Sequence, residues 1–155
     1  MNLRLGHPVA ACHQSVVEDF APFGEFVRST LGKRPDLQVI GEVSDGLEAV
    51  WQAQELKPEL ILLDIGLPTL NGLEAARQIR QVAPESKIIF VSQESSADVV
   101  QEALNLGARG YVLKARAAID LLAAVKAVLE GRQFVSDGLP GHNFTEARPR
   151  PPADY

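Results

Sequence analysis

The sequence predicts a doubly wound α/β domain, in which helices cover both faces of a mostly parallel sheet. Short apolar segments of strand length alternate five times with segments whose apolar residues recur at helical spacing. Glycine, proline or asparagine marks most of the junctions between them. Helices between successive strands require right-handed crossovers, which place the strands parallel. The 155 residues suit one domain with one such sheet.

The strand-like segments are short and rich in valine, isoleucine and leucine. They cover residues 15–17, 37–43, 60–64, 87–92 and 110–114. The third contains four consecutive apolar residues, a run typical of a strand buried on both faces, and ends in Asp64. Open α/β sheets bind their ligands at this end of the strands, which makes Asp64 a candidate chemical centre. Alternatively, Asp64 only begins a turn or caps the next helix.

Helical periodicity fills the intervals between these strands. Residues 22–31 and 119–129 form the first and last predicted helices. Three further helices are expected between them, beginning at Leu47, Asn71 and Ser96 and ending before Pro58, Pro84 and Gly107. Proline ends a helix because it lacks an amide hydrogen, and glycine because it readily adopts the left-handed backbone of a helix end.

The two ends of the chain differ in composition from the middle. Residues 1–13 lack the continuous apolar core of a signal peptide. We expect them instead to be a leader that is non-native or disordered. The folded domain is then expected to cover residues 14–132. Residues 133–155 contain four prolines and no apolar period after residue 137, and are expected to form a C-terminal linker or tail.

The composition excludes several functional classes. The formal net charge is −5, which disfavours direct nucleic-acid binding by this segment. Cys12 is the only cysteine, so an intrachain disulfide and a cysteine-based metal cluster are excluded, and a cytoplasmic location is expected. No apolar run approaches the length of a membrane span, so no membrane contact is expected.

Four of the five predicted strands end in residues with obvious chemistry: Glu18 and Asp19, Asp64, Ser92, and Lys114. Because the carboxyl ends of parallel strands meet at one edge of the sheet, these side chains should lie close together. Three crowded carboxylates repel one another, and a cation relieves that repulsion. Oxygen ligands without histidine or cysteine select Mg²⁺ before Zn²⁺.

The remaining two side chains favour phosphate chemistry. The ammonium of Lys114 and the hydroxyl of Ser92 suit a phosphoryl group with three charged oxygens. Asp64 could itself be the nucleophile and form an aspartyl phosphate. Each residue alone has a simpler interpretation, as a solvated turn, a turn serine or a surface lysine. Their joint placement at successive strand ends favours the functional interpretation.

These motifs together resemble the receiver domain of two-component response regulators. The matching residues are 16–19, 64–68 with 71–72, 91–92 and 111–114, and the resemblance covers residues 14–132. It implies a flavodoxin-like fold of five βα units with a five-stranded parallel sheet in the order 2-1-3-4-5. It also implies a signalling domain rather than an enzyme. Such a domain catalyses only its own phosphoryl transfer and dephosphorylation.

The resemblance further implies that Asp64 accepts phosphate from a sensor histidine kinase or a phosphotransfer protein. The metal ligands it implies for Mg²⁺ are Asp19, Asp64 and the backbone carbonyl of Gly66, with Glu18 in the outer sphere.

Three residues would then sense the phosphoryl group. Ser92 would bond to it and move toward it, Tyr111 would turn inward behind Ser92, and Lys114 would pair with the phosphoryl oxygens.

Segments 39–46, 105–111 and 131–136 resemble receivers of the NarL/LuxR type, which precede a helix-turn-helix domain. This implies that residues 96–130 form the surface that controls an output, expected to be transcription, and that a homodimer can form on phosphorylation. Two departures stand out: Ala115 replaces a common proline after Lys114, and Gln93 is longer than the usual residue after Ser92.

Other functional classes stay open. An aspartyl-phosphate phosphatase or phosphotransferase carries a second aspartate two residues after the nucleophile, where this chain has Gly66. A pseudo-receiver binding module would lack part of the acidic, serine and lysine set. A flavin-binding module of similar topology is disfavoured because no phosphate-cradling loop follows the first strand.

Overall fold

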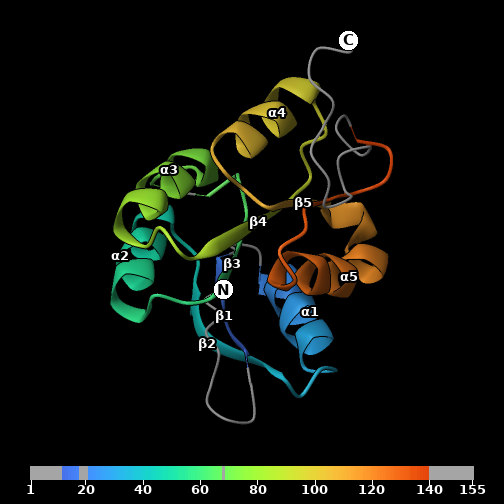
Figure 1. Ribbon diagram of the computed structural model, residues 1–155, viewed down its shortest axis with the longest axis horizontal. Helices are drawn as coiled ribbons and strands as arrows, with labels where there is room; N and C mark the ends of the chain where they lie inside the picture. The colour runs from blue at the N-terminus through green and yellow to red at the C-terminus, as the bar shows by residue number, and fades with distance from the viewer. Residues whose placement is uncertain (1–11, 18–20, 68, 140–155) are drawn as a thin grey trace.

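A parallel sheet of six strands runs through the middle of the molecule in the order β2-β1-β3-β4-β5-β6 (Figure 1). The computed structural model describes residues 12–17, 21–67 and 69–139. Its strands are β1 (Cys12–Val17), β2 (Leu37–Val43), β3 (Leu60–Leu63), β4 (Lys87–Ser92), β5 (Gly110–Leu113) and β6 (Phe134–Val135). The predicted doubly wound fold and the order of the first five strands are confirmed.

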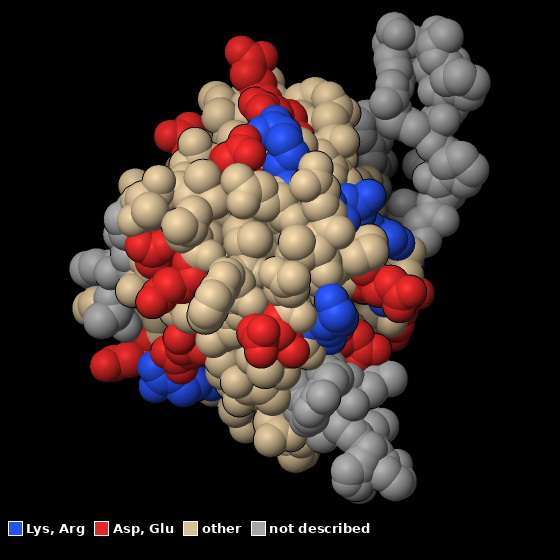
Figure 2. Space-filling view, turned by 90° about the vertical axis from the view of Figure 1, so that its left-hand side faces the viewer, with Lys and Arg blue, Asp and Glu red and all other residues tan. Residues whose placement is uncertain are grey.

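Helices cover both faces of this sheet. They are α1 (Ala21–Leu31), α2 (Gly46–Leu56), α3 (Gly72–Val82), α4 (Ala97–Asn105) and α5 (Ala117–Leu129). In Figure 1, α1 and α5 lie on one side, and α2, α3 and α4 lie on the other. The side that carries α2 and α3 is shown space-filled in Figure 2, where much of the surface is uncharged.

The apolar run of β3 reflects burial on both faces. Ile61 and Leu63 pack into the cluster under α2, α3 and α4, whereas Leu60 and Leu62 pack into the cluster under α1 and α5. All four side chains are at most 2% exposed. Because successive side chains of a strand point to opposite faces, a central strand with two covered faces must be apolar throughout.

The helix starts follow the predicted capping residues. The Asn71 side chain accepts a hydrogen bond from the Glu74 amide at 2.9 Å, and the Ser96 hydroxyl accepts one from the Val99 amide at 3.2 Å. Glycine 107 has φ +102° just after α4, as expected of a glycine that ends a helix.

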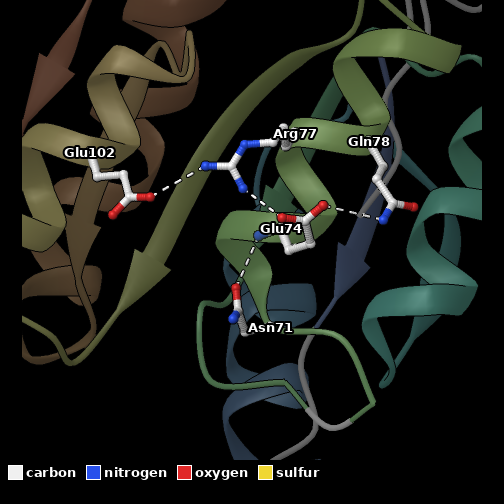
Figure 3. Close-up of polar contacts among 5 residues, drawn as sticks. All are labelled: Asn71, Glu74, Arg77, Gln78 and Glu102. Atoms are coloured by element: carbon white, nitrogen blue, oxygen red, sulfur yellow. Dashed lines mark hydrogen bonds and ion pairs between the residues drawn. The ribbon is translucent and has the colours of Figure 1, made fainter.

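Helix α3 is linked to α4 along its outer surface (Figure 3). Arg77 donates to Glu74 of the same helix at 2.5 Å and forms an ion pair with Glu102 of α4 at 3.3 Å. Gln78 also donates to Glu74, at 3.3 Å. All of these groups except Gln78 are well exposed, so each ion pair contributes at most about 1 kcal/mol.

The structure extends the predicted fold at three places: the start of β1, the segment before α5, and a sixth strand after α5. Strand β1 begins at Cys12, inside the segment expected to be a leader. A single turn of 3₁₀ helix, Lys114–Arg116, precedes α5, which begins at Ala117 rather than at residue 119.

The sixth strand is the largest difference, because it lies in the segment expected to be a linker and makes the sheet six-stranded rather than five-stranded. It pairs parallel to β5, and Val135, Ser136 and Leu139 are buried. A strand of two residues is too short to show a periodic pattern, so the sequence alone could not reveal it.

Candidate functional site

A hollow of about 540 Å³ opens at the carboxyl edge of the sheet, and we call it the Asp64 hollow. Its walls come from α1 and from the segments that follow β3, β4 and β5. The lining residues are Phe23, Asp64, Ile65, Gly66, Ser92, Gln93, Glu94 and Lys114. The structure thus brings together four of the residues selected from the sequence: Asp64, Gly66, Ser92 and Lys114. Glu18 and Asp19 lie outside the described residues.

Asp64 is a nearly buried carboxylate with a cationic partner. It is 6% exposed, and its Oδ2 accepts a hydrogen bond from Lys114 Nζ at 3.1 Å. Its Oδ1 accepts a longer one from the Gly66 amide at 3.3 Å. Burial of an unpaired carboxylate would be costly, so the ammonium of Lys114 is what makes this placement tolerable.

The loop after Asp64 needs glycine at position 72. The Gly72 amide donates to the Ile65 carbonyl at 2.7 Å, which folds the loop back under the end of β3. A Cβ atom at Gly72 would overlap the Asp64 carbonyl oxygen and lie 2.6 Å from Ile65 Cα. The Asn-Gly pair therefore has two separate roles: Asn71 caps α3, and Gly72 permits the close approach that positions Asp64.

A second contact holds the same loop to α2. Thr69 has φ +68° and donates a hydrogen bond to Asp45 Oδ2 at 2.7 Å. The other oxygen of Asp45 caps α2 through the Leu47 and Glu48 amides. The Thr69 hydroxyl holds the pKa of Asp45 below its usual value, helped by these amides. Sequence reasoning missed this contact because the two residues are 24 positions apart.

Ser92 and Tyr111 form a connected pair beside the hollow. Ser92 is 2% exposed and accepts a hydrogen bond from the Glu94 amide at 3.0 Å. The buried Tyr111 hydroxyl donates to the Glu94 carbonyl at 2.8 Å. Burial raises the pKa of Tyr111, and a hydrogen bond with Ser92 offsets part of that rise. The Tyr111 ring is therefore already buried in this structure, in the inward orientation that the resemblance implies for the state in which Ser92 has bonded to a phosphoryl group.

Lys114 rests on an aromatic ring that sequence reasoning assigned only to the apolar stripe of a helix. Its Nζ lies 4.8 Å from the centroid of the Phe23 ring, which in turn packs against Phe26 at 5.6 Å. A cation over a ring face is attracted by the π-electrons, so Phe23 helps hold the ammonium near Asp64. Only the fold brings α1 next to the end of β5.

A buried polar network lies behind Lys114. Asp120 is 5% exposed and accepts hydrogen bonds from Arg116 at 2.9 Å and from the Ser136 hydroxyl at 2.8 Å. The Ser136 hydroxyl accepts one from the Leu113 amide at 3.1 Å. The segment after β6 is thereby tied to the residue that precedes Lys114, a link with no sequence signal.

The described residues supply only part of a metal site. Within residues 12–17, 21–67 and 69–139, no three histidine, cysteine, aspartate or glutamate side chains gather at one point. Two residues with carboxylates, Asp64 and Glu94, line the hollow, and neither histidine nor cysteine does. Such hard oxygen donors fit Mg²⁺, while Glu18 and Asp19, the other predicted ligands, are not described.

The sequence that forms this fold matches a known family. The model of the response regulator receiver domain covers residues 15–126. The chain belongs to this family. Asp64 directly follows β3, the position that the sequence resemblance implies for a phosphoacceptor. The family assignment made from the sequence is confirmed.

Known receivers of one branch are similar to this chain. Transcriptional regulatory protein DegU of Brevibacillus brevis is 34% identical over 120 residues, which are 77% of this chain and 51% of that protein. Nitrate/nitrite response regulator protein NarL of Escherichia coli K12 is 33% identical over 124 residues, 80% of this chain and 57% of that protein. The chain thus spans about half the length of these curated relatives.

A solved structure gives the same placement. A two-component response regulator of the LuxR family from Aurantimonas sp. SI85-9A1 superposes with a TM-score of 0.77 at 29% identity, over 83% of this chain and 91% of that one. The receiver is therefore of the NarL/LuxR type, as its sequence motifs indicate. None of its described helices is both long and apolar enough to cross a membrane.

Proposed function

We propose that Asp64 accepts a phosphoryl group from the phosphohistidine of a sensor histidine kinase or phosphotransfer protein, and that this controls an output, most simply transcription. One observation carries the proposal. A nearly buried carboxylate lies 3.1 Å from a lysine ammonium and opens into a hollow that also holds a buried serine hydroxyl. Transfer of a charged group needs positioned charges of this kind more than it needs covalent assistance.

The transfer step follows from these groups. A carboxylate oxygen of Asp64 forms a bond to phosphorus as the phosphorus–nitrogen bond of phosphohistidine breaks, and the electron pair returns to the imidazole. Lys114 is close enough to pair with a phosphoryl oxygen on Asp64, and the Ser92 hydroxyl can donate to another.

Mg²⁺ is expected to be held by Asp19, Asp64 and the Gly66 carbonyl, with Glu18 in the outer sphere. When bound, the ion would neutralise charge on the phosphoryl oxygens. The Asp64 carboxylate in the hollow, with no histidine or cysteine in its lining, supports this assignment.

The signal would pass through Ser92 and Tyr111. If Ser92 moves toward the phosphoryl group to donate to it, the segment before α4 would have to follow or lose a contact, because the Ser92 oxygen accepts a hydrogen bond from the Glu94 amide of that segment. The Glu94 carbonyl of the same segment accepts the Tyr111 hydrogen bond, so a shift of this segment would also alter the contact that holds Tyr111 inward. The surface that reports them would be α4, β5 and α5. Ile119 of α5 is 70% exposed and is a candidate contact in a phosphorylation-dependent homodimer.

Two rival functions have different requirements at the Asp64 hollow. An aspartyl-phosphate phosphatase would need an acid/base group two residues after Asp64, and Gly66 has no side chain to supply one. A pseudo-receiver would bind a partner without taking phosphate.

We expect this domain to act in the cytoplasm, without direct nucleic-acid binding by this segment.

Incubation with Mg²⁺ and acetyl phosphate that carries radioactive phosphorus tests the proposal, because the label follows the phosphoryl group. We expect the wild-type chain to incorporate label that hydroxylamine releases, as it does for acyl phosphates, and the Asp64→Asn variant to incorporate none. Asp98→Asn, a change of an exposed aspartate on α4, is the matched control and should label normally. Labelling of Asp64→Asn at the wild-type rate would remove Asp64 from its role. An unlabelled wild type would favour the pseudo-receiver, and sustained hydrolysis of small phosphate esters would favour the phosphatase.

A further inference from the structure

A second concave surface lies between α2 and the edge strand β2, and we call it the α2 groove. It measures about 620 Å³, and its lining includes Leu47, Glu48, Trp51 and Glu55 of α2 and Ile40 and Val43 of β2. None of these residues lines the Asp64 hollow. The groove therefore has no part in the proposed phosphoryl chemistry, and the inference drawn from it does not depend on that function.

The groove exposes large apolar side chains that the fold does not need. Among the described residues three large apolar side chains are exposed, and two of them, Trp51 at 75% and Leu47 at 52%, line this groove. The opposite side of α2, with Ala49 and Ala53, already packs into the core. Exposed tryptophan next to other apolar groups is typical of a binding surface, because it offers a large area to a partner.

The charges of the groove have one sign. Glu48 and Glu55 line it, and no lysine or arginine does. The broad uncharged area on the face shown in Figure 2 has both acidic and basic side chains along its margins, so the single sign of charge holds only for the lining of the groove itself. The two glutamates are seven positions apart on α2, which places them about 10 Å apart along the helix axis. Two basic side chains at positions i and i+7 of a facing helix would match that spacing.

We propose that the α2 groove binds a cationic amphipathic helix of a partner protein. Apolar residues of the partner at i, i+3 or i+4, and i+7 would cover Trp51 and Leu47, and flanking lysines or arginines would pair with Glu48 and Glu55. The eleven residues of α2 extend about 16 Å, enough for three turns of such a helix. A second copy of this chain fits poorly, because a symmetric contact would bring identical acidic margins together.

The chain offers a direct reporter, since Trp51 is its only tryptophan. The probe is a designed leucine- and lysine-rich amphipathic peptide of about four turns, titrated into the full chain while Trp51 emission is recorded. We expect a saturable shift of the emission to shorter wavelength as the indole leaves water. The Glu48→Lys/Glu55→Lys variant should bind about tenfold more weakly. The control Glu25→Lys/Glu85→Lys has the same charge change at exposed positions outside the groove and should bind as wild type.

Other outcomes would overturn the proposal. One is the absence of a saturable shift in Trp51 emission. Another is equal weakening of peptide binding in both charge-reversed variants, because that result would indicate general attraction of the peptide to an acidic protein. Concentration-dependent self-association that Trp51→Ala abolishes would assign the groove to a second copy. A change of Trp51 emission, without added peptide, in the Arg148→Glu/Arg150→Glu variant would show that the C-terminal segment of this chain occupies the groove. Circular dichroism of each variant establishes that the fold is retained.

Discussion

Replacing Gly72 with alanine should destabilise the protein by distorting the loop that presents Asp64. The added Cβ would overlap the Asp64 carbonyl oxygen and lie 2.6 Å from Ile65 Cα. Both neighbours are backbone atoms, so no flexible side chain can move aside to make room. Either the Gly72–Ile65 hydrogen bond of 2.7 Å lengthens or the start of α3 shifts away from β3.

The size of the effect follows from opposing contributions. Forcing a methyl group into a packed backbone contact costs about 3 kcal/mol. Alanine is favoured over glycine in a helix by at most about 1 kcal/mol, and by less in the first turn. The net loss in the free energy of unfolding is therefore about 2 kcal/mol, which lowers the melting temperature by about 4–8 °C in a chain of this size.

Urea unfolding followed by circular dichroism measures this loss, and the same loop supplies the control. Gly66 has open space around its missing Cβ and no positive φ, so Gly66→Ala should leave stability unchanged or raise it by up to ~1 kcal/mol. Because Asp64 moves with the loop, Gly72→Ala should also label more slowly with acetyl phosphate. Equal unfolding midpoints for the two variants would refute the steric argument.

Two further changes probe the surroundings of the hollow. Tyr111→Phe loses the bond to the Glu94 carbonyl and should be less stable by about 1 kcal/mol near pH 8. Since burial raises the Tyr111 pKa, the unfolded chain ionises first as the pH rises past about 10, so wild type loses stability there and the gap narrows. A gap in urea midpoints that is constant with pH would contradict this. Phe23→Leu removes the ring under Lys114 and should slow labelling of Asp64 about two- to tenfold, whereas Phe23→Trp should retain the rate. An undiminished rate in the leucine variant would show that the ring does not position Lys114.

The sequence allowed the fold and much of the site to be predicted, for a reason visible in β3. A strand covered on both faces must be apolar throughout, so it stands out from the amphipathic helices around it. Once the strands are recognised, parallel topology brings Asp64, Ser92 and Lys114 to one edge. The short strand β6 was not predictable, because two residues show no period and its pairing with β5 depends on the completed sheet.

What the sequence by itself determined was the alternation of strands and helices and which chemical groups end the strands. Both depend on local patterns of polarity that a folded core requires. The tertiary structure alone decided that Phe23 supports Lys114, that Tyr111 bonds to Glu94, and that Ser136 binds Asp120. Each of these contacts joins residues 16 or more positions apart. They exist because packing two layers of helices onto the sheet brings those side chains within a few ångströms, and no local pattern encodes that distance.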